Sequence, residues 1–263
     1  MRNKAIPFVA WFIPLIPLTL AFAIYFGELQ VSSFLAINHF TQQLPDIVWA
    51  IFTFLGNGWG IFAIAFPLLL LAPRLLTAGI FAGAIAAITS ITLKSLFNLP
   101  RPASLLTEGT FYRIGEPLLH KSFPSGHTIT AFAIASALYF SCDRSKRKPL
   151  LGLFVLAGFV GLSRSAVGAH WLTDVFAGAG VGIWCGMIGA LSASYFPENQ
   201  LGPKKIWSHL IALGGAVAIY AHLTQIMDLE LNLPLQYASI ALLAITLIFY
   251  IKAQFVNAPS QFK

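Results

Sequence analysis

The chain has 263 residues, of which 57% are hydrophobic and 10% are charged, and its net charge is +7. Soluble domains carry about 25% charged residues, so this composition excludes an ordinary soluble protein and favours a polytopic membrane protein. In such a chain the positive charge is typical of cytoplasmic loops rich in Lys and Arg, and we expect no nucleic-acid partner. Two cysteines, Cys142 and Cys185, give neither a disulfide framework nor the spacing of a metal site.

Apolar segments that could cross a bilayer recur along the whole chain. A membrane-spanning helix needs about 20 predominantly apolar residues. Gly56-Asn57-Gly58 interrupts the second segment, which predicts either a break or an interfacial start there. We therefore expect an all-α fold, a polytopic membrane helical bundle of eight spans: 6–26, 45–72, 74–97, 125–141, 150–167, 172–195, 206–224 and 235–255.

The first span has two interpretations. Arg2 and Lys4 precede it, and the small-residue triplet Ala21-Phe22-Ala23 is typical of a signal-peptide cleavage site. The apolar run is longer than the hydrophobic region of a usual signal peptide, which favours an uncleaved membrane anchor.

Basic residues predict the orientation. They gather in alternate connections, and cytoplasmic loops carry an excess of Lys and Arg. We therefore expect a multi-pass protein of the cytoplasmic (inner) membrane with both termini in the cytoplasm. The residues assigned to the cytoplasmic side are Arg2, Lys4, Arg74, Arg144, Lys146, Arg147, Lys148, Lys204, Lys205, Lys252 and Lys263.

Several ionisable residues then fall on the opposite, periplasmic side, against the charge rule. Ionisable groups in such places indicate a functional site by default. Snorkelling toward lipid headgroups is the alternative, and it explains Arg113 and Lys121 better than the others. The full set is Lys94, Arg101, Arg113, Lys121, Arg164, His120, His127 and His170.

Two segments have the chemistry of an anion site. Arg101 lies between Pro100 and Pro102, which hold the backbone extended and aim the guanidinium in one direction. Pro124-Ser125-Gly126-His127 precedes an apolar helix, whose first N–H groups attract anions. The plainer interpretation of the second segment is a helix cap with an interfacial histidine.

A third segment adds a nucleophile. His170 and Asp174 are four residues apart and so share one face if the segment is helical. A carboxylate bonded to one imidazole nitrogen leaves the other free to attack. A packed histidine beside a capping aspartate is the alternative.

Together these segments resemble the type 2 phosphatidic acid phosphatase superfamily, whose integral-membrane members hydrolyse lipid phosphates and diphosphates. The resemblance spans about residues 94–174 and implies a six-span core. The matching residues are Lys94, Arg101 and Pro102, then Pro124, Ser125, Gly126 and His127, then Ser163, Arg164, His170 and Asp174.

The resemblance implies a role for each residue. His170 would attack phosphorus, Asp174 would orient it, and His127 would protonate the leaving group. The phosphoryl oxygens would be held by Lys94, Arg101, Arg164, Ser125 and Gly126. Neither a metal nor another cofactor is implied. The loop 103–122 could cover the site, with Arg113, His120 or Lys121 touching the substrate head, or it could be an ordinary surface loop.

One integral-membrane domain, residues 1–263, is expected, with the phosphatase core in 1–196 and an additional pair of spans in 197–263. The resemblance implies a lipid phosphate as substrate, at the outer leaflet of the bilayer. Undecaprenyl diphosphate and phosphatidylglycerol phosphate are the first expectations. A lipid A phosphatase or phosphotransferase is the alternative, and a non-hydrolytic lipid transporter or binding protein is a further one. The motifs do not indicate an oligomeric state.

Overall fold

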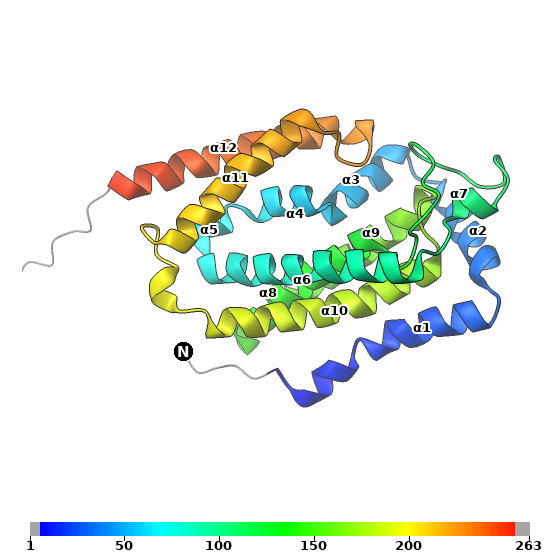
Figure 1. Cartoon of the computed structure of the whole chain (residues 1–263), viewed down its shortest axis with the longest axis horizontal. Helices are drawn as coiled ribbons and strands as arrows, with labels where there is room; N and C mark the ends of the chain where they lie inside the picture. Colours follow the sequence, from blue (N-terminus) through cyan, green and yellow to red (C-terminus); the bar gives the residue numbers. More distant parts are fainter. Residues whose placement is uncertain (1–5, 256–263) are drawn as a thin grey trace, which may run out of the picture.

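The computed structural model describes residues 6–255, and within this range the protein is helical without any strand (Figure 1). This agrees with the predicted membrane helical bundle. The predicted cytoplasmic charges Arg2, Lys4 and Lys263 lie outside the described residues.

The N-terminal span is formed by two helices in succession. A 3-10 helix, η1 (Phe8–Phe12), leads into α1 (Leu15–Phe26), which runs along one side of the bundle (Figure 1). Next comes α2 (Gln30–Thr41), which was not predicted because its mixed polar and apolar residues show no run long enough for a span.

The predicted break in the second span is confirmed. Helices α3 (Asp46–Gly56) and α4 (Gly58–Ala65) meet at an angle of 78°. Asn57 lies at the joint in an extended conformation, and its side-chain oxygen accepts hydrogen bonds from the amides of Trp59 and Gly60. The short helix α5 (Leu68–Leu71) follows Pro67, which ends the regular hydrogen bonding of α4.

Four helices form the centre of the bundle: α6 (Pro73–Phe97), α8 (Gly126–Ser141), α9 (Leu151–Ala166) and α10 (Leu172–Tyr195) (Figure 1). A 3-10 helix, η2 (Arg144–Lys146), joins α8 to α9. Buried alanines, among them Ala82, Ala86 and Ala133, fill the space between α6, α8 and α10. Small side chains let the axes approach, which favours dispersion contacts where lipid removes the hydrophobic driving force.

Glycines on α10 make the closest of these approaches. A Cβ atom at Gly182 would lie 2.5 Å from the carbonyl oxygen of Ile129, and one at Gly186 would lie 2.3 Å from that of Ala133. These glycines therefore allow α10 to pack closely on α8. Gly83 on α6 has no such contact, because a Cβ there would meet no atom within 4 Å.

The C-terminal pair, α11 (Ile206–Thr224) and α12 (Leu233–Phe255), packs against α4 and α5 at the far side of the bundle (Figure 1). Their shared core includes Phe66, Leu76, Leu243 and Tyr250. Two 3-10 helices, η3 (Glu198–Gln200) and η4 (Glu230–Asn232), lie in the connections before α11 and before α12.

The number of helices with the length of a span is smaller than predicted. Within residues 6–255, five helical segments are long and apolar enough to cross a membrane, and the bent pair of α3 and α4 makes a sixth. Helices α8 and α9 have 16 residues each, or about 24 Å at 1.5 Å per residue, against a hydrocarbon core of about 30 Å. Their crossing of the bilayer remains a prediction.

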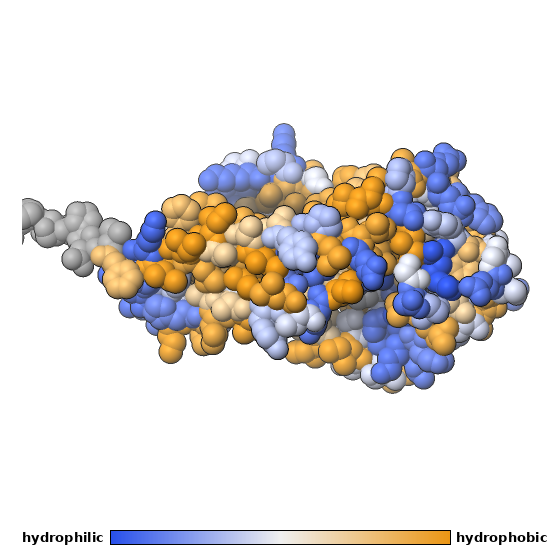
Figure 2. Space-filling view, turned by 90° about the horizontal axis from the view of Figure 1, so that it is seen from above, coloured by the Kyte–Doolittle hydropathy of each residue, from blue (hydrophilic) through white to orange (hydrophobic). Residues whose placement is uncertain are grey.

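Polar residues gather toward the ends of the molecule. Figure 2 shows a predominantly hydrophobic surface over the middle of the bundle and a large hydrophilic region at the end that carries α2 and α7 (Pro102–Leu105). The start of α6, which carries Arg74, and the basic connections that contain η2 and Lys204 lie toward the opposite end (Figure 1). The functional motifs therefore share one end of the bundle, as expected.

Candidate active site

Arg101 is the buried centre of the first motif. Its backbone is extended, as its flanking prolines predicted, and its side chain is enclosed at the end of the bundle. The guanidinium donates to the carbonyl oxygens of His120 (2.8 Å) and Ala169 (2.9 Å), and Nη1 lies 3.2 Å from Nε2 of His170. These contacts fix the direction of the positive charge and connect the first motif to the third.

His170 lies between a carboxylate and this guanidinium. Its Nδ1 is 3.1 Å from Oδ2 of Asp174, while its Nε2 faces Arg101. A carboxylate only accepts and a guanidinium only donates, so one tautomer satisfies both contacts: the proton sits on Nδ1 and the lone pair on Nε2. Burial, then the charges of Arg101 and Lys94, hold the pKa of His170 well below its ordinary value. The imidazole is therefore neutral, as a nucleophile requires.

Asp174 is fixed by three donors on the same oxygen. Besides Nδ1 of His170, the amide of Trp171 donates from 3.0 Å, and the hydroxyl of Ser122 makes a short hydrogen bond. Asp174 is the third residue of α10 and also closes the first turn of that helix. The local fold thus sets the carboxylate before any substrate arrives.

The second motif begins α8. Ser125 is the fully buried N-cap, and its hydroxyl oxygen accepts from the side chain and the amide of Thr128. That hydroxyl therefore has partners of its own, which supports the capping role. The amides of Gly126 and His127 are the first of the helix and lack intrahelical acceptors. A Cβ at Gly126 would lie 3.0 Å from Oγ of Ser90, so glycine allows α8 to begin close to α6.

Two further cations complete the cluster. Nζ of Lys94 donates to the carbonyl oxygen of Lys121 at 2.7 Å. Arg164 is buried and donates from Nη1 to the hydroxyl of Thr53, while its Nε has no hydrogen-bond partner among the described residues. Buried polar groups are normally paired, so this guanidinium has capacity left for an anion.

The cluster carries more positive than negative charge. Over residues 6–255, neither Lys94, Arg101 nor Arg164 has a carboxylate within 4 Å. The nearest acidic groups, Asp174 and Asp228, each contact a histidine instead. Three fixed cations around a neutral histidine form a site suited to a tetrahedral oxyanion.

The three loop residues that could contact the substrate head, Arg113, His120 and Lys121, have different surroundings. The guanidinium of Arg113 forms an ion pair with the exposed Glu108 at 3.5 Å. His120 and Lys121 have exposed side chains, and they enter the site through their backbone carbonyl oxygens, which accept from Arg101 and Lys94. Contact of these three side chains with a substrate remains a prediction.

Three residues of the site were missed in the sequence. The side chain of buried Asn38 on α2 binds the backbone of Tyr112 and Ser165, which joins the outer loop to the end of α9. The hydroxyl of Ser122 donates to Asp174. The only indication in the sequence was its position just before the second motif. Asp228, in the connection between α11 and α12, contacts His127. The only indication in the sequence was that the predicted topology places Asp228 on the same side of the membrane as the motifs.

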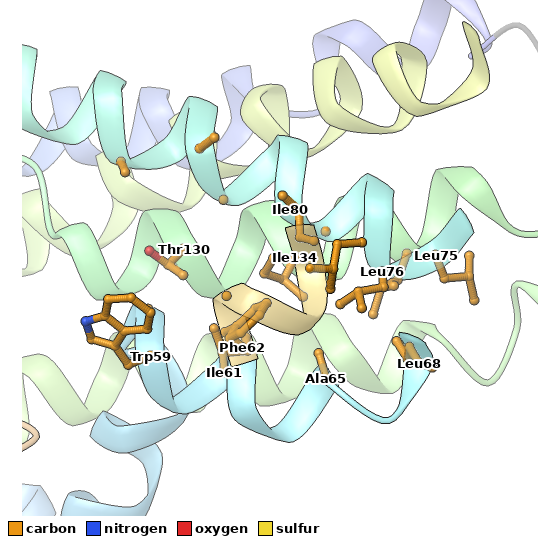
Figure 3. Close-up of a pocket in the computed structure, with 18 of the residues that line it drawn as sticks. Trp59, Ile61, Phe62, Ala65, Leu68, Leu75, Leu76, Ile80, Thr130 and Ile134 are labelled. Atoms are coloured by element: carbon orange, nitrogen blue, oxygen red, sulfur yellow. The ribbon is translucent and has the colours of Figure 1, made fainter. Parts of the chain in front are cut away.

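An apolar cavity of about 690 Å³ begins near the site. Trp59 and Thr130 lie at one end and Leu68 and Leu75 at the other, so the cavity follows the bundle between α4, α6, α8 and α11 (Figure 3). Thr130 lies one turn into α8, and its hydroxyl donates to the carbonyl oxygen of Gly126, the first residue of that helix. The cavity thus runs from the polar end into the apolar middle.

Comparison with known proteins agrees with this geometry. The model of the PAP2 superfamily matches residues 74–201, which include all three motifs. A lipid A 1-phosphatase of Porphyromonas gingivalis is 43% identical over 70 residues, covering 26% of this chain and 15% of that protein. One of Rhizobium etli is 32% identical over 121 residues, covering 44% of this chain and 48% of that protein. The chain thus spans less than half the length of these curated relatives.

Solved structures extend the similarity over the fold. The crystal structure of Aquifex aeolicus LpxE is 34% identical, with a TM-score of 0.54, and the match covers 61% of this chain and 94% of that one. A PAP2-type phosphatidylglycerolphosphate phosphatase of Bacillus subtilis matches at 20% identity, with a TM-score of 0.51, over 71% of this chain and 98% of that one, which is a likeness of fold alone. The chain belongs to the type 2 phosphatidic acid phosphatase (PAP2) superfamily.

Proposed function

We propose that the protein is a membrane lipid phosphatase that acts through a phosphohistidine intermediate. The observation that carries this proposal is the position of His170, whose Nδ1 faces Asp174 and whose Nε2 faces Arg101 in a buried cluster of cations. Phosphoryl transfer depends mainly on positioning and on neutralising charge at the equatorial oxygens. Lys94, Arg101 and Arg164 would supply that charge.

The proposed reaction has two steps. In the first, Nε2 of His170 attacks phosphorus, the bond from phosphorus to the lipid oxygen breaks, and His127 gives its proton to that oxygen. In the second, His127 takes a proton from water as the water attacks phosphorus. The phosphorus–nitrogen bond then breaks, inorganic phosphate leaves, and the lone pair returns to Nε2. Both histidines end as they began.

We favour the 1-phosphate of lipid A as the substrate. The curated relatives that match are named lipid A 1-phosphatases, and the LpxE structure is the solved neighbour of higher identity. Undecaprenyl diphosphate and phosphatidylglycerol phosphate, the first expectations from the sequence, take second place, because the neighbour named for phosphatidylglycerolphosphate supports the fold only.

The site is further proposed to face away from the cytoplasm, at the outer leaflet of the inner membrane. The basic connections lie toward the end of the bundle opposite the motifs, and Lys and Arg favour the cytoplasmic side. Both termini would then be cytoplasmic.

Phosphate release from a panel of lipids tests the proposed function. The purified protein in detergent, with EDTA present, is expected to release phosphate from lipid A faster than from undecaprenyl diphosphate, phosphatidylglycerol phosphate or phosphatidic acid. A different order of rates would replace lipid A as the favoured substrate. Absence of release from every lipid would contradict the phosphatase proposal, and a strict requirement for Mg²⁺ would contradict its mechanism.

We propose that the apolar cavity receives one acyl chain of the substrate. Its lining includes Asn57, whose amide contacts the carboxylate next to His127, so a chain bound in this cavity would have one end near the reacting phosphate. Its volume of about 690 Å³ is within the usual range of ligand sites, about 300–1,000 Å³.

Filling the cavity is expected to weaken binding of long-chain substrates. Gly83→Leu adds a side chain where a Cβ meets no atom within 4 Å, so the helices need not move. We expect KM for a long-chain lipid to rise about tenfold, the low end of the effect of one methylene group in a hydrophobic pocket, with KM for a water-soluble phosphate monoester unchanged. Steady-state kinetics on the two substrates measures this difference.

The matched control is Gly158→Leu on α9. Gly158 is exposed on the outside of the bundle and also has no atom within 4 Å of a built Cβ. It should leave KM for both substrates unchanged. An equal effect of Gly83→Leu on the soluble ester would show that the cavity does not discriminate by chain length.

A further inference from the structure

Asp228 reaches the active site from outside the matched phosphatase region. It lies between α11 and α12, beyond residues 74–201, which match the family. Its Oδ1 is 2.9 Å from Nε2 of His127, an ion-pair distance, although the ring N–H is not aligned for a hydrogen bond. Its side chain is 18% exposed and that of His127 is 20% exposed, so the contact is largely shielded from water.

The position of this carboxylate is fixed from two sides. Nδ2 of Asn57, at the joint of α3 and α4, donates to the other oxygen, Oδ2, at 2.9 Å. The backbone of Asp228 is in the left-handed region, with φ of 66°. Aspartate tolerates this conformation better than most residues do. The residue as a whole is exposed whereas its side chain is largely buried, so the carboxylate is turned toward the protein interior.

The residues on both sides of Asp228 anchor the segment to the core. Met227 packs against Phe54, and Leu229 packs in the cluster that contains Trp49. The side chain of buried Gln236 accepts from the amide of Met227, and its amide group donates to the carbonyl oxygen of Gln225. Such a segment holds its acidic residue in one place rather than presenting it to solvent.

The charges around this contact explain what the carboxylate can do. Burial alone would raise the pKa of Asp228, but His127, Arg164 and the amide of Asn57 more than offset it and lower the pKa below its ordinary value. Asp228 is therefore ionised. The groups that face His127 are Arg164 on α9 and Lys94 on α6, both cationic, and Asp228 is the anion that opposes them.

We propose that Asp228 is a positioning residue that orients the ring of His127 and favours its protonated form, so that the C-terminal helix pair completes the active site. With Nε2 facing the carboxylate, Nδ1 is the nitrogen left to protonate the leaving oxygen. An adjacent anion stabilises an imidazolium, and two adjacent cations would otherwise oppose it. This inference rests on the proposed phosphatase function and assigns a part in it to residues 197–263.

Asp228→Asn tests this inference. The substitution keeps the size and one acceptor of the side chain and removes its charge. We expect kcat/KM for lipid A to fall about 10- to 100-fold, mostly through kcat, because only part of the general-acid contribution is lost. The alkaline limb of the pH profile of kcat/KM should move to lower pH by about one unit. Asp228→Glu should restore part of the rate and of the profile.

Two controls separate positioning from folding. Glu230→Gln removes a charge from the same segment at an exposed position and should leave the rate and the pH profile unchanged. In a His127→Asn background, Asp228→Asn should have no further effect, because coupled residues are not additive. A purely structural role would lower the rate equally in both backgrounds, without moving the pH profile, and that result would overturn the inference.

The two proposals can fail separately. If His170→Ala abolishes phosphate release while Asp228→Asn keeps the rate and pH profile of the unmodified protein, the phosphatase stands and the role of Asp228 is wrong. If His170→Ala still releases phosphate, the proposed reaction itself is wrong.

Discussion

His170→Ala is expected to reduce phosphate release by about 10⁴-fold or more, because the nucleophile of the first step is removed. The neighbours of His170 should keep their places, since Arg101 is also held by the carbonyl oxygens of His120 and Ala169. The measurement is release of inorganic phosphate from lipid A by purified protein in detergent, with EDTA in every assay.

The control for this substitution is His39→Ala. His39 is exposed on α2, at the same end of the bundle, and takes no part in the site. Its loss should leave the rate unchanged. A trapping experiment adds a second readout: acid-labile radioactive phosphate should attach to the unmodified protein and not to the His170→Ala variant. Label retained by that variant would contradict the assignment of the nucleophile.

Gly182→Leu is expected to prevent correct packing of α10 on α8. A Cβ at this position would lie 2.5 Å from the carbonyl oxygen of Ile129 and 2.9 Å from Cβ of Phe132. Backbone atoms cannot turn aside as a side chain can, so the two helices must separate, at a cost of about 3 kcal/mol or more in the free energy of unfolding. Separation would also move Ser125 and Asp174, whose backbones are hydrogen-bonded at the start of the same interface.

Size-exclusion chromatography and thermal unfolding in detergent measure this effect. The variant should elute as aggregate or unfold at a clearly lower temperature than the unmodified protein. Gly152→Leu is the matched control, because Gly152 is exposed on α9 and a Cβ there meets nothing within 4 Å. Equal thermal stability of both variants would mean that the α8–α10 interface tolerates the separation.

Local chemistry explains which features could be predicted from the sequence. The extended backbone of Arg101 follows from its two prolines, and the break at Asn57 follows from two glycines that weaken the helix on either side. The pairing of His170 with Asp174 follows from their spacing and needs no knowledge of other helices. Features that are determined within a few residues could therefore be predicted from the sequence.

Features that depend on packing between helices could not be predicted from the sequence. Gly182 and Gly83 belong to the same kind of four-residue repeat, yet one meets a backbone and the other faces a cavity, because the helix opposite each glycine decides the contact. Asn38 shows no pattern that marks it as buried. Asp228 lies outside the three motifs in the sequence, and only the folded C-terminal pair brings it to His127.

The side chain of Asn57 ties the course of the chain through the membrane to the acid–base chemistry at its surface. Its oxygen accepts from the first amides of α4, and its nitrogen donates to Asp228. Aspartate could still accept but would repel the carboxylate, and serine would be too short to span both partners. A single amide therefore connects the bend between α3 and α4 to the carboxylate that we propose favours the protonated form of His127, so a change in the bend angle would displace that carboxylate.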